Sequence, residues 1–176
     1  TISVMAAGDY TVTVTDPNGC MASAMTTIVV NPLPMPTITV TDASGTANDD
    51  GILCDGDAAT LDAGVYTAYI WSTGDITQTI SVTAAGDYTV TVTDANGCVG
   101  IATTTIVVNP LPVPVITVTE TSGTTDDDGI ICTGDDAVLD AGTFAAYNWS
   151  TGDMTQTITV TMAGDYTVTV TDGNGC

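Results

Sequence analysis

The sequence repeats itself with a period of 78 residues, and this feature constrains the possible folds more than any other. Cys20, Cys98 and Cys176 share one position in the repeat, because 98 − 20 and 176 − 98 both equal 78. When residues 35–98 are aligned with residues 113–176, 46 of 64 positions are identical and no gap is needed. A chain of this kind is a tandem array of one small folding unit.

The period divides the chain into three parts joined by two spacers. Residues 1–31 are the C-terminal part of one repeat, residues 35–109 a complete repeat, and residues 113–176 a repeat that lacks its last strand. Because neither end falls on a repeat boundary, we expect the natural protein to continue on both sides. The spacers, residues 31–36 and 109–114, carry alternate prolines that fix φ and favour an extended backbone. The array is therefore predicted to be a stiff rod.

The pattern within one repeat predicts an all-β fold. In residues 88–93 a Tyr and two Val alternate with three Thr, so one face is apolar and the other polar. A turn at residues 94–97 and a partner strand at residues 99–108 complete a hairpin. Further strands are expected at residues 38–40, 59–61, 69–71 and 79–82. Six or seven strands in about 78 residues indicate an immunoglobulin-like β-sandwich.

The apolar positions of these strands define the expected core of each repeat. We predict that they pack between the two sheets, where they exclude water. In the complete repeat they are Leu61, Trp71, Ile80, Tyr88, Val90 and Val92, and in the following repeat Leu139, Trp149, Ile158, Tyr166, Val168 and Val170.

Charge excludes several classes of function. The chain has 21 acidic side chains and no Lys, Arg or His, which gives a formal net charge of −21. Nucleic acids and anionic membranes should be repelled, because binding to both depends on basic side chains. There is no apolar run long enough to insert into a membrane. Without a His base, a Lys nucleophile or an Arg clamp, an enzyme is not expected.

An ordered set of short motifs resembles a known class of repeat. The set includes Leu-Asp-Ala-Gly at 61–64, Trp-Ser-Thr-Gly-Asp at 71–75, Ala-Gly-Asp-Tyr-Thr-Val-Thr-Val-Thr-Asp at 85–94, Asn-Gly-Cys at 96–98 and Asn-Pro-Leu-Pro at 109–112. It resembles the immunoglobulin-like and PKD-like repeats of giant surface proteins in Bacteroidetes, and is similar to the repeats of gliding-motility adhesins. The resemblance implies an extracellular array displayed on the cell surface, exported by the type IX route.

The five cysteines are predicted to form structural disulfides, because no cation is present to activate a thiol. Two pairings remain open. Pairing within a repeat would join Cys54 to Cys98 and Cys132 to Cys176, and would leave Cys20 for a partner elsewhere. In a sandwich, however, those positions lie at opposite ends, while bridged Cα atoms must be within about 7 Å. Head-to-tail stacking would instead join Cys54 to Cys176.

Acidic loops offer a possible site for calcium, the one cofactor that the sequence suggests. Asp49, Asp50, Asp127 and Asp128 concentrate carboxylate oxygens, which calcium prefers. Their spacing is not that of an EF-hand, and Asp, Asn, Ser and Gly are also ordinary turn formers. Both readings stand at this point: a calcium site and a solvated loop.

We expect a structural or adhesive rod whose partners are neighbouring repeats and other copies of the array. The alternative is an array of carbohydrate-binding modules from a secreted enzyme. That function needs exposed aromatic side chains, and the only candidates are Tyr66 and Tyr69, with Phe144 and Tyr147 in the next repeat. The sequence does not identify a ligand.

Overall fold

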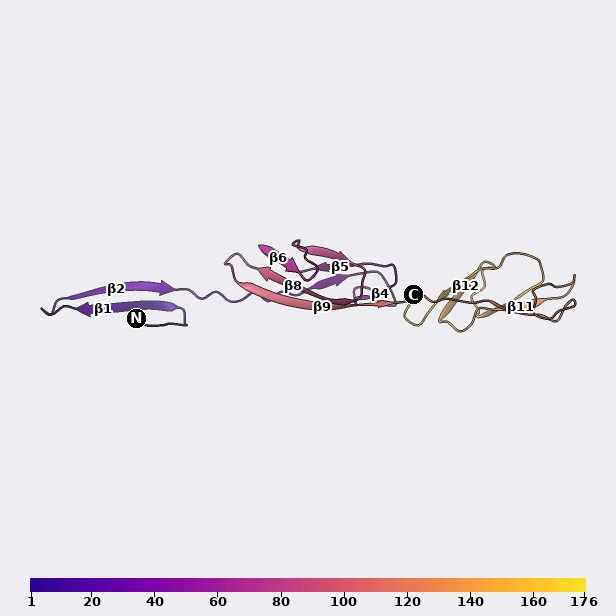
Figure 1. Cartoon of the computed structure of the whole chain (residues 1–176), viewed down its shortest axis with the longest axis horizontal. Helices are drawn as coiled ribbons and strands as arrows, with labels where there is room; N and C mark the ends of the chain where they lie inside the picture. The colour runs from indigo at the N-terminus through magenta and orange to yellow at the C-terminus, as the bar shows by residue number, and fades with distance from the viewer.

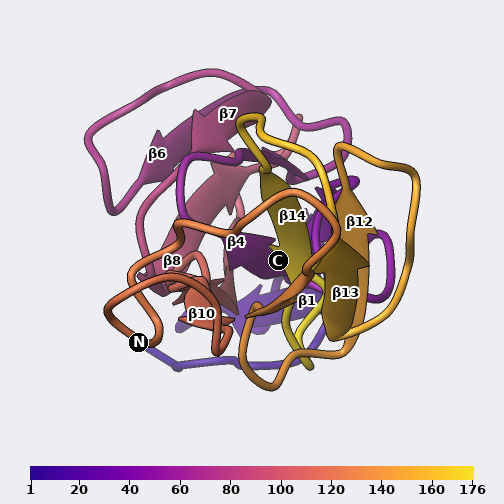
Figure 2. The same cartoon turned by 90° about the vertical axis from the view of Figure 1, so that its right-hand side faces the viewer.

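The computed structural model describes all 176 residues and is an elongated all-β molecule without helices. Figure 1 shows three bodies in a line: an N-terminal hairpin, a central sandwich and a third, more open body. The C-terminus lies between the second and third bodies rather than at the far end of the rod. In Figure 2, which looks along this axis, the bodies lie one behind another and overlap in part. The all-β fold predicted from the alternating pattern is confirmed.

Fourteen strands make up the molecule. The N-terminal hairpin contains β1 (Gly8–Thr15) and β2 (Met21–Ile28). The central repeat contains β3 (Thr39–Thr41), β4 (Ile52–Cys54), β5 (Ala59–Asp62), β6 (Ala68–Trp71), β7 (Thr79–Val82), β8 (Gly86–Thr93) and β9 (Val99–Asn109). The third repeat contains β10 (Thr117–Thr119), β11 (Ala137–Asp140), β12 (Ala146–Trp149), β13 (Thr157–Val160) and β14 (Val168–Thr171).

The central repeat is a two-sheet sandwich. One sheet has the order β3-β5-β7 and the other β4-β9-β8-β6, with all pairs antiparallel except β4 and β9. These seven strands and their order match an immunoglobulin-like arrangement. Sequence reasoning did not identify β4, a three-residue strand that runs parallel to the end of β9, with Ile52 opposite Val107. Alternation cannot be recognised over so few residues.

The predicted core of the central repeat lies between these sheets. Ten residues form a buried cluster, and Trp71, Leu61, Ile80, Val90 and Val92 of the predicted set belong to it. Tyr88 is only partly buried, because its hydroxyl donates a hydrogen bond of 2.9 Å to the Ala84 carbonyl at the edge of the sandwich. An amphipathic ring with a polar tip commonly takes such a border position.

The third repeat has the same two-sheet architecture with five strands instead of seven, because the counterparts of β4 and β9 are both missing. Its sheets are β10-β11-β13 and β12-β14, and no strand occupies the position that β9 holds in the central repeat. Its buried cluster has five residues, which include Leu139, Trp149, Ile158 and Val170 of the predicted core. Tyr166 and Val168 are partly buried against it. A core of half the size follows from the open side of the sandwich.

The two spacers take up no regular structure of their own except at Asn109, which ends β9. The first spacer lies directly against the central repeat at Gly100, which is buried. A Cβ added to Gly100 would collide with the carbonyl oxygen of Pro34. The absence of a side chain at this position therefore lets the spacer dock on the start of β9.

Candidate functional site

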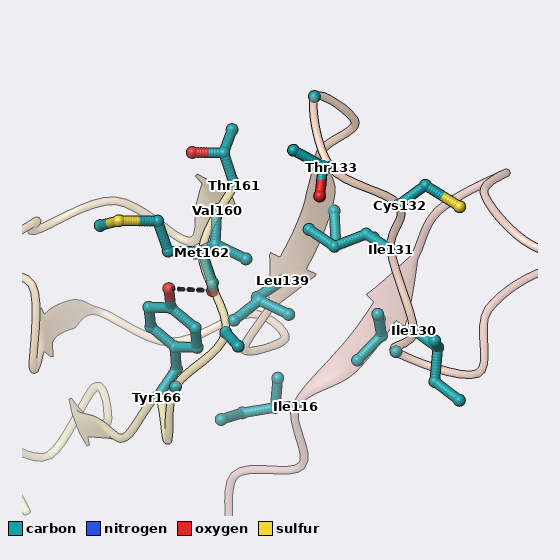
Figure 3. Close-up of a pocket in the computed structure, with 16 residues that line it drawn as sticks. Ile116, Ile130, Ile131, Cys132, Thr133, Leu139, Val160, Thr161, Met162 and Tyr166 are labelled. Atoms are coloured by element: carbon teal, nitrogen blue, oxygen red, sulfur yellow. Dashed lines mark hydrogen bonds between the residues drawn. The ribbon is translucent and has the colours of Figure 1, made fainter.

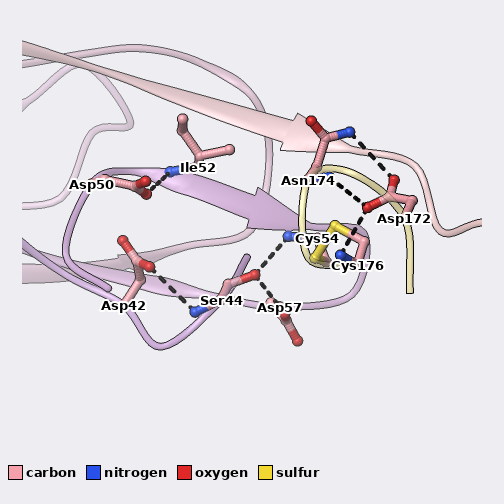
Figure 4. Close-up of a disulfide and its surroundings, with 9 residues drawn as sticks. All are labelled: Asp42, Ser44, Asp50, Ile52, Cys54, Asp57, Asp172, Asn174 and Cys176. Carbon is pink, nitrogen blue, oxygen red and sulfur yellow. Dashed lines mark hydrogen bonds between the residues drawn. A yellow bond between two sulfur atoms is a disulfide. The ribbon is translucent and has the colours of Figure 1, made fainter. Parts of the chain in front are cut away.

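The candidate functional site is the junction between the central and third repeats. A disulfide joins Cys54, at the end of β4, to Cys176, with 5.4 Å between their Cα atoms (Figure 4). The bridge therefore connects adjacent repeats and spans 122 residues of sequence. Of the two pairings that the sequence left open, the structure contains the stacked one. Cys98 and Cys132 are free thiols, so neither within-repeat pair is present.

Cys176 is held in place by a turn that a short sequence motif specifies. One carboxylate oxygen of Asp172 accepts hydrogen bonds from the Asn174 amide at 2.8 Å and from the Cys176 amide at 3.0 Å. The bond from the Cys176 amide is the main cause that lowers the pKa of the Asp172 carboxyl. Asp94 closes the turn at Cys98 in the same way. Each repeat therefore presents a rigid Asp-x-Asn-Gly-Cys tip.

The surface that receives this tip is a loop of the central repeat organised by two buried polar residues. Asp42 is only 6% exposed and accepts hydrogen bonds from the Ser44 and Gly51 amides. The Ser44 hydroxyl accepts from the Cys54 amide and donates to Asp57, each at 2.7 Å. Because Ser44 bonds the backbone of Cys54 directly, the loop fixes the position of the bridging sulfur (Figure 4).

The tip and the loop meet at van der Waals distance. A Cβ added to Gly175 would lie 2.6 Å from the carbonyl carbon of Gly45, and one added to Gly45 would lie 3.2 Å from the Asn174 carbonyl oxygen. Two glycines therefore face each other across the junction, where any larger residue would separate the backbones. Gly175 also has a φ of +84°, a conformation that favours glycine.

Sequence reasoning named the cysteines but assigned no role at the junction to Asp42, Ser44, Asp172 or Gly175. A signal for them existed, because the next repeat reproduces the loop. Glu120 takes the place of Asp42 and binds the Ser122 and Asp128 amides, and Ser122 accepts from the Cys132 amide at 2.8 Å. An acidic residue followed at the second position by Ser, in both copies, could have indicated a shared loop. The repeated motif does not, however, indicate that this loop docks onto a neighbouring repeat.

The four aspartates proposed as calcium ligands lie in this pair of loops. Asp49 accepts a hydrogen bond from the Asp42 amide and Asp50 from the Ile52 amide, and Asp127 and Asp128 repeat these bonds in the third repeat. Asp49 and Asp127 have positive φ values of 62° and 61°. No group of three or more metal-ligating side chains is gathered in the chain. The observed bonds are those of turn formers, and the calcium site stays a prediction.

The candidate aromatic platform is partly engaged in structural contacts. Tyr66 and Tyr69 meet edge to face with ring centroids 6.5 Å apart, and the Tyr69 hydroxyl donates to the Gly64 carbonyl at 2.9 Å. Phe144 and Tyr147 repeat the arrangement, at 6.4 Å. The hydroxyls of Tyr69 and Tyr147 each bond a backbone carbonyl of the loop beside them, so these two rings serve a structural role.

The scan against protein-family models gave no match, and neither did the search of curated proteins.

Proposed function

We propose that this chain is a structural module of an extracellular rod, in which tandem β-sandwiches are bonded end to end to carry tension along a stalk or fibre. The observation that carries the proposal is the disulfide between Cys54 and Cys176. A bridge inside one sandwich would stabilise that sandwich alone. A bridge between neighbours makes the two units a single covalent body.

The position of the bridge changes the path that a pulling force takes. When the chain is pulled at its two ends, the load runs along the backbone from Thr1 to Cys54 and then crosses the sulfur atoms to Cys176. The intervening residues, which include β5 to β14, lie outside this path. They can unfold without letting the molecule lengthen. A stalk in which the load crosses the disulfide in this way keeps its length under load.

The chemistry of the bridge also supports the proposed location. Structural disulfides form and persist in oxidising compartments, so the bond favours a non-cytoplasmic protein. No helix of the structure is long and apolar enough to cross a membrane. Display at the cell surface, and adhesion there, are part of the proposal.

Single-molecule extension with handles at both termini tests the load path. A fully extended residue spans about 3.3–3.6 Å, so the 122-residue loop should hide roughly 400 Å of length in the oxidised protein. We expect that length to be released by reductant or by Cys54→Ser. Cys98→Ser is the matched control, because it leaves the bridge intact. Equal extension of oxidised and reduced protein would refute the load-bearing role.

A further inference from the structure

The two covalent links between the central and third repeats leave the central repeat side by side. The backbone continues from Asn109, the last residue of β9, and the disulfide leaves from Cys54, the last residue of β4. In the parallel pairing of β4 with β9 these two residues lie opposite each other, and the Asp55 amide donates to the Asn109 carbonyl at 2.8 Å. A body that is held at two neighbouring points of one sheet can neither turn nor tilt freely.

The non-covalent contact between these repeats has no apolar core. Each buried cluster draws all its residues from one repeat, and no sheet and no backbone hydrogen bond joins the two repeats. They meet where the backbones of Gly45 and Gly175 touch. Domains move relative to each other by default unless their interface is large and apolar. The contact by itself therefore does not fix the angle between the repeats.

The spacer does not fix this angle either. Leu111 and Val113 are 54% and 84% exposed, so the spacer is not packed into a repeat. The first spacer, which precedes a complete repeat, has the same character, with Leu33 70% and Met35 89% exposed. Alternate prolines fix φ only at their own positions. The torsions between them still allow the repeats to turn about the spacer.

Charge favours separation of the two repeats. Residues 35–109 contain nine acidic side chains and residues 113–176 contain ten, and neither range has a basic one. Asp57 of the central repeat and Asp172 of the third lie beside the bridge (Figure 4). At about 0.15 M salt the Debye length is about 8 Å, so acidic groups closer than this still repel each other. The bridge holds the repeats together against this repulsion.

Each repeat has a core of its own that does not include the bridge. The central cluster of ten buried residues and the third repeat's cluster of five both lack Cys54 and Cys176. In the third repeat Leu139 is buried beside Ile116, Val160 and Tyr166 (Figure 3). Loss of the bridge therefore removes a link between the repeats and no part of either core.

We propose that the bridge between Cys54 and Cys176 is a redox switch for the shape of the rod. In the oxidised state it holds the two repeats in line, as in Figure 1. In the reduced state the repeats stay folded but bend and turn about the spacer. The inference rests on the proposed function, because it assigns a regulation to the same bridge.

Exchange with a dithiol opens the bridge. Cys54 is only 6% exposed and Cys176 is partly exposed, so the attacking thiolate reaches the sulfur of Cys176, and Cys54 leaves as a thiolate. The second thiol of the reductant then displaces Cys176. The dithiol becomes a disulfide and gives two electrons to the bridge, and its two protons end on the two cysteines.

The surroundings of the bridge disfavour anionic reductants. The attacking group is a thiolate, and it approaches an acidic surface that has no basic side chain to offset the charge. Glutathione carries a negative charge even before its thiol ionises, whereas 2-mercaptoethanol and dithiothreitol are neutral. The structure therefore favours uncharged thiols as the reductants of this switch.

Small-angle X-ray scattering of the whole chain, before and after reduction with dithiothreitol, tests the change of shape. We expect the reduced chain to have a broader distribution of interatomic distances with a smaller mean. Cys54→Ser should give the reduced profile without reductant. Cys132→Ser is the matched control, because it removes the free thiol at the equivalent position of the third repeat, and it should keep the oxidised profile.

Tryptophan fluorescence separates bending from unfolding. Trp71 and Trp149 are each 2% exposed, so their emission reports on the core of each repeat. Unchanged emission together with changed scattering would support the switch. A red shift on reduction, or identical scattering in the two states, would overturn it. Failure of the load path is a separate result, because extension measures length released under force, whereas scattering measures the angle between repeats without force.

Rates of reduction test the preference for uncharged thiols. Glutathione and 2-mercaptoethanol should be compared at equal thiolate concentration, in about 10 mM and about 150 mM salt, where the Debye length is about 30 Å and about 8 Å. We expect the rate constant for glutathione to be the lower one and to rise roughly threefold or more with salt. The rate constant for 2-mercaptoethanol should rise less. An equal response of the two thiols to salt would refute the selection by charge.

Discussion

Glycine decides how closely neighbouring repeats approach. Gly175 and Gly97 hold the same position in the hairpin tips of their repeats and have similar φ values, +84° and +81°. Their surroundings differ, because only Gly175 lies against a neighbouring loop, while nothing is within 4 Å of a Cβ added to Gly97. A substitution at either glycine therefore strains the backbone, but only one at Gly175 also disturbs the junction between repeats.

This pair of residues gives a matched test of the junction. Gly97→Ala should cost about 1 kcal/mol, from positive φ alone. Gly175→Ala carries the same strain and also collides with Gly45, so we expect a larger drop in melting temperature and slower formation of the Cys54–Cys176 bridge. Calorimetry and thiol counting during oxidative refolding would measure both effects. If the two variants had the same melting temperature and formed the bridge at the same rate, the junction would tolerate a wider separation of the two repeats.

Between elements, one polar contact joins the ends of two neighbouring strands. Asp62 ends β5, and Gln78 immediately precedes β7, the strand that pairs with it. The Gln78 side-chain amide donates to the Asp62 carboxylate at 2.9 Å, and the Gly64 amide donates to the same oxygen at 2.8 Å. The bond from Gln78 is the main cause that lowers the pKa of the Asp62 carboxyl. Asp140 and Gln156 repeat the contact in the third repeat, again with a lowered pKa.

The sign of the resulting pH dependence follows from the direction of the pKa shift. A carboxyl with a lower pKa in the folded state contributes stability above its unfolded pKa, near 3.8, and loses it as the pH falls through the folded value. Asp62→Ala should therefore lower the melting temperature by a few degrees at neutral pH. The difference from the unaltered protein should shrink below pH 3.8. Melting curves of both proteins across this range measure it, and a constant difference would exclude the ionised carboxylate as its source.

On the scale of the whole molecule, the electrostatic energy is dominated by repulsion. With 21 acidic side chains and no basic one, side chains can form no ion pairs that salt would weaken. Raising monovalent salt from about 10 mM to about 150 mM shortens the Debye length from about 30 Å to about 8 Å. We expect the melting temperature to rise by several degrees over this range. Proteins stabilised by ion pairs respond in the opposite direction.

The same experiment separates screening from specific calcium binding. Calcium and magnesium chlorides should be compared with sodium chloride at equal ionic strength. A further rise specific to calcium, lost in Asp49→Asn and Asp127→Asn, would support the predicted site. Equal effects of the two divalent ions would show that the loops bind no calcium selectively.

The sequence by itself determined the strands and the core of each repeat. Alternation of Thr with Val and Tyr specified the strands, because side chains of a strand point to opposite faces in turn, and Trp71, Leu61 and Val90 were recognisable as core. Tertiary structure decided how the units are joined. The choice of Cys176 over Cys98 as the partner of Cys54 depends on which ends of two sandwiches meet. Such contacts join residues more than a hundred positions apart, and no local pattern records them.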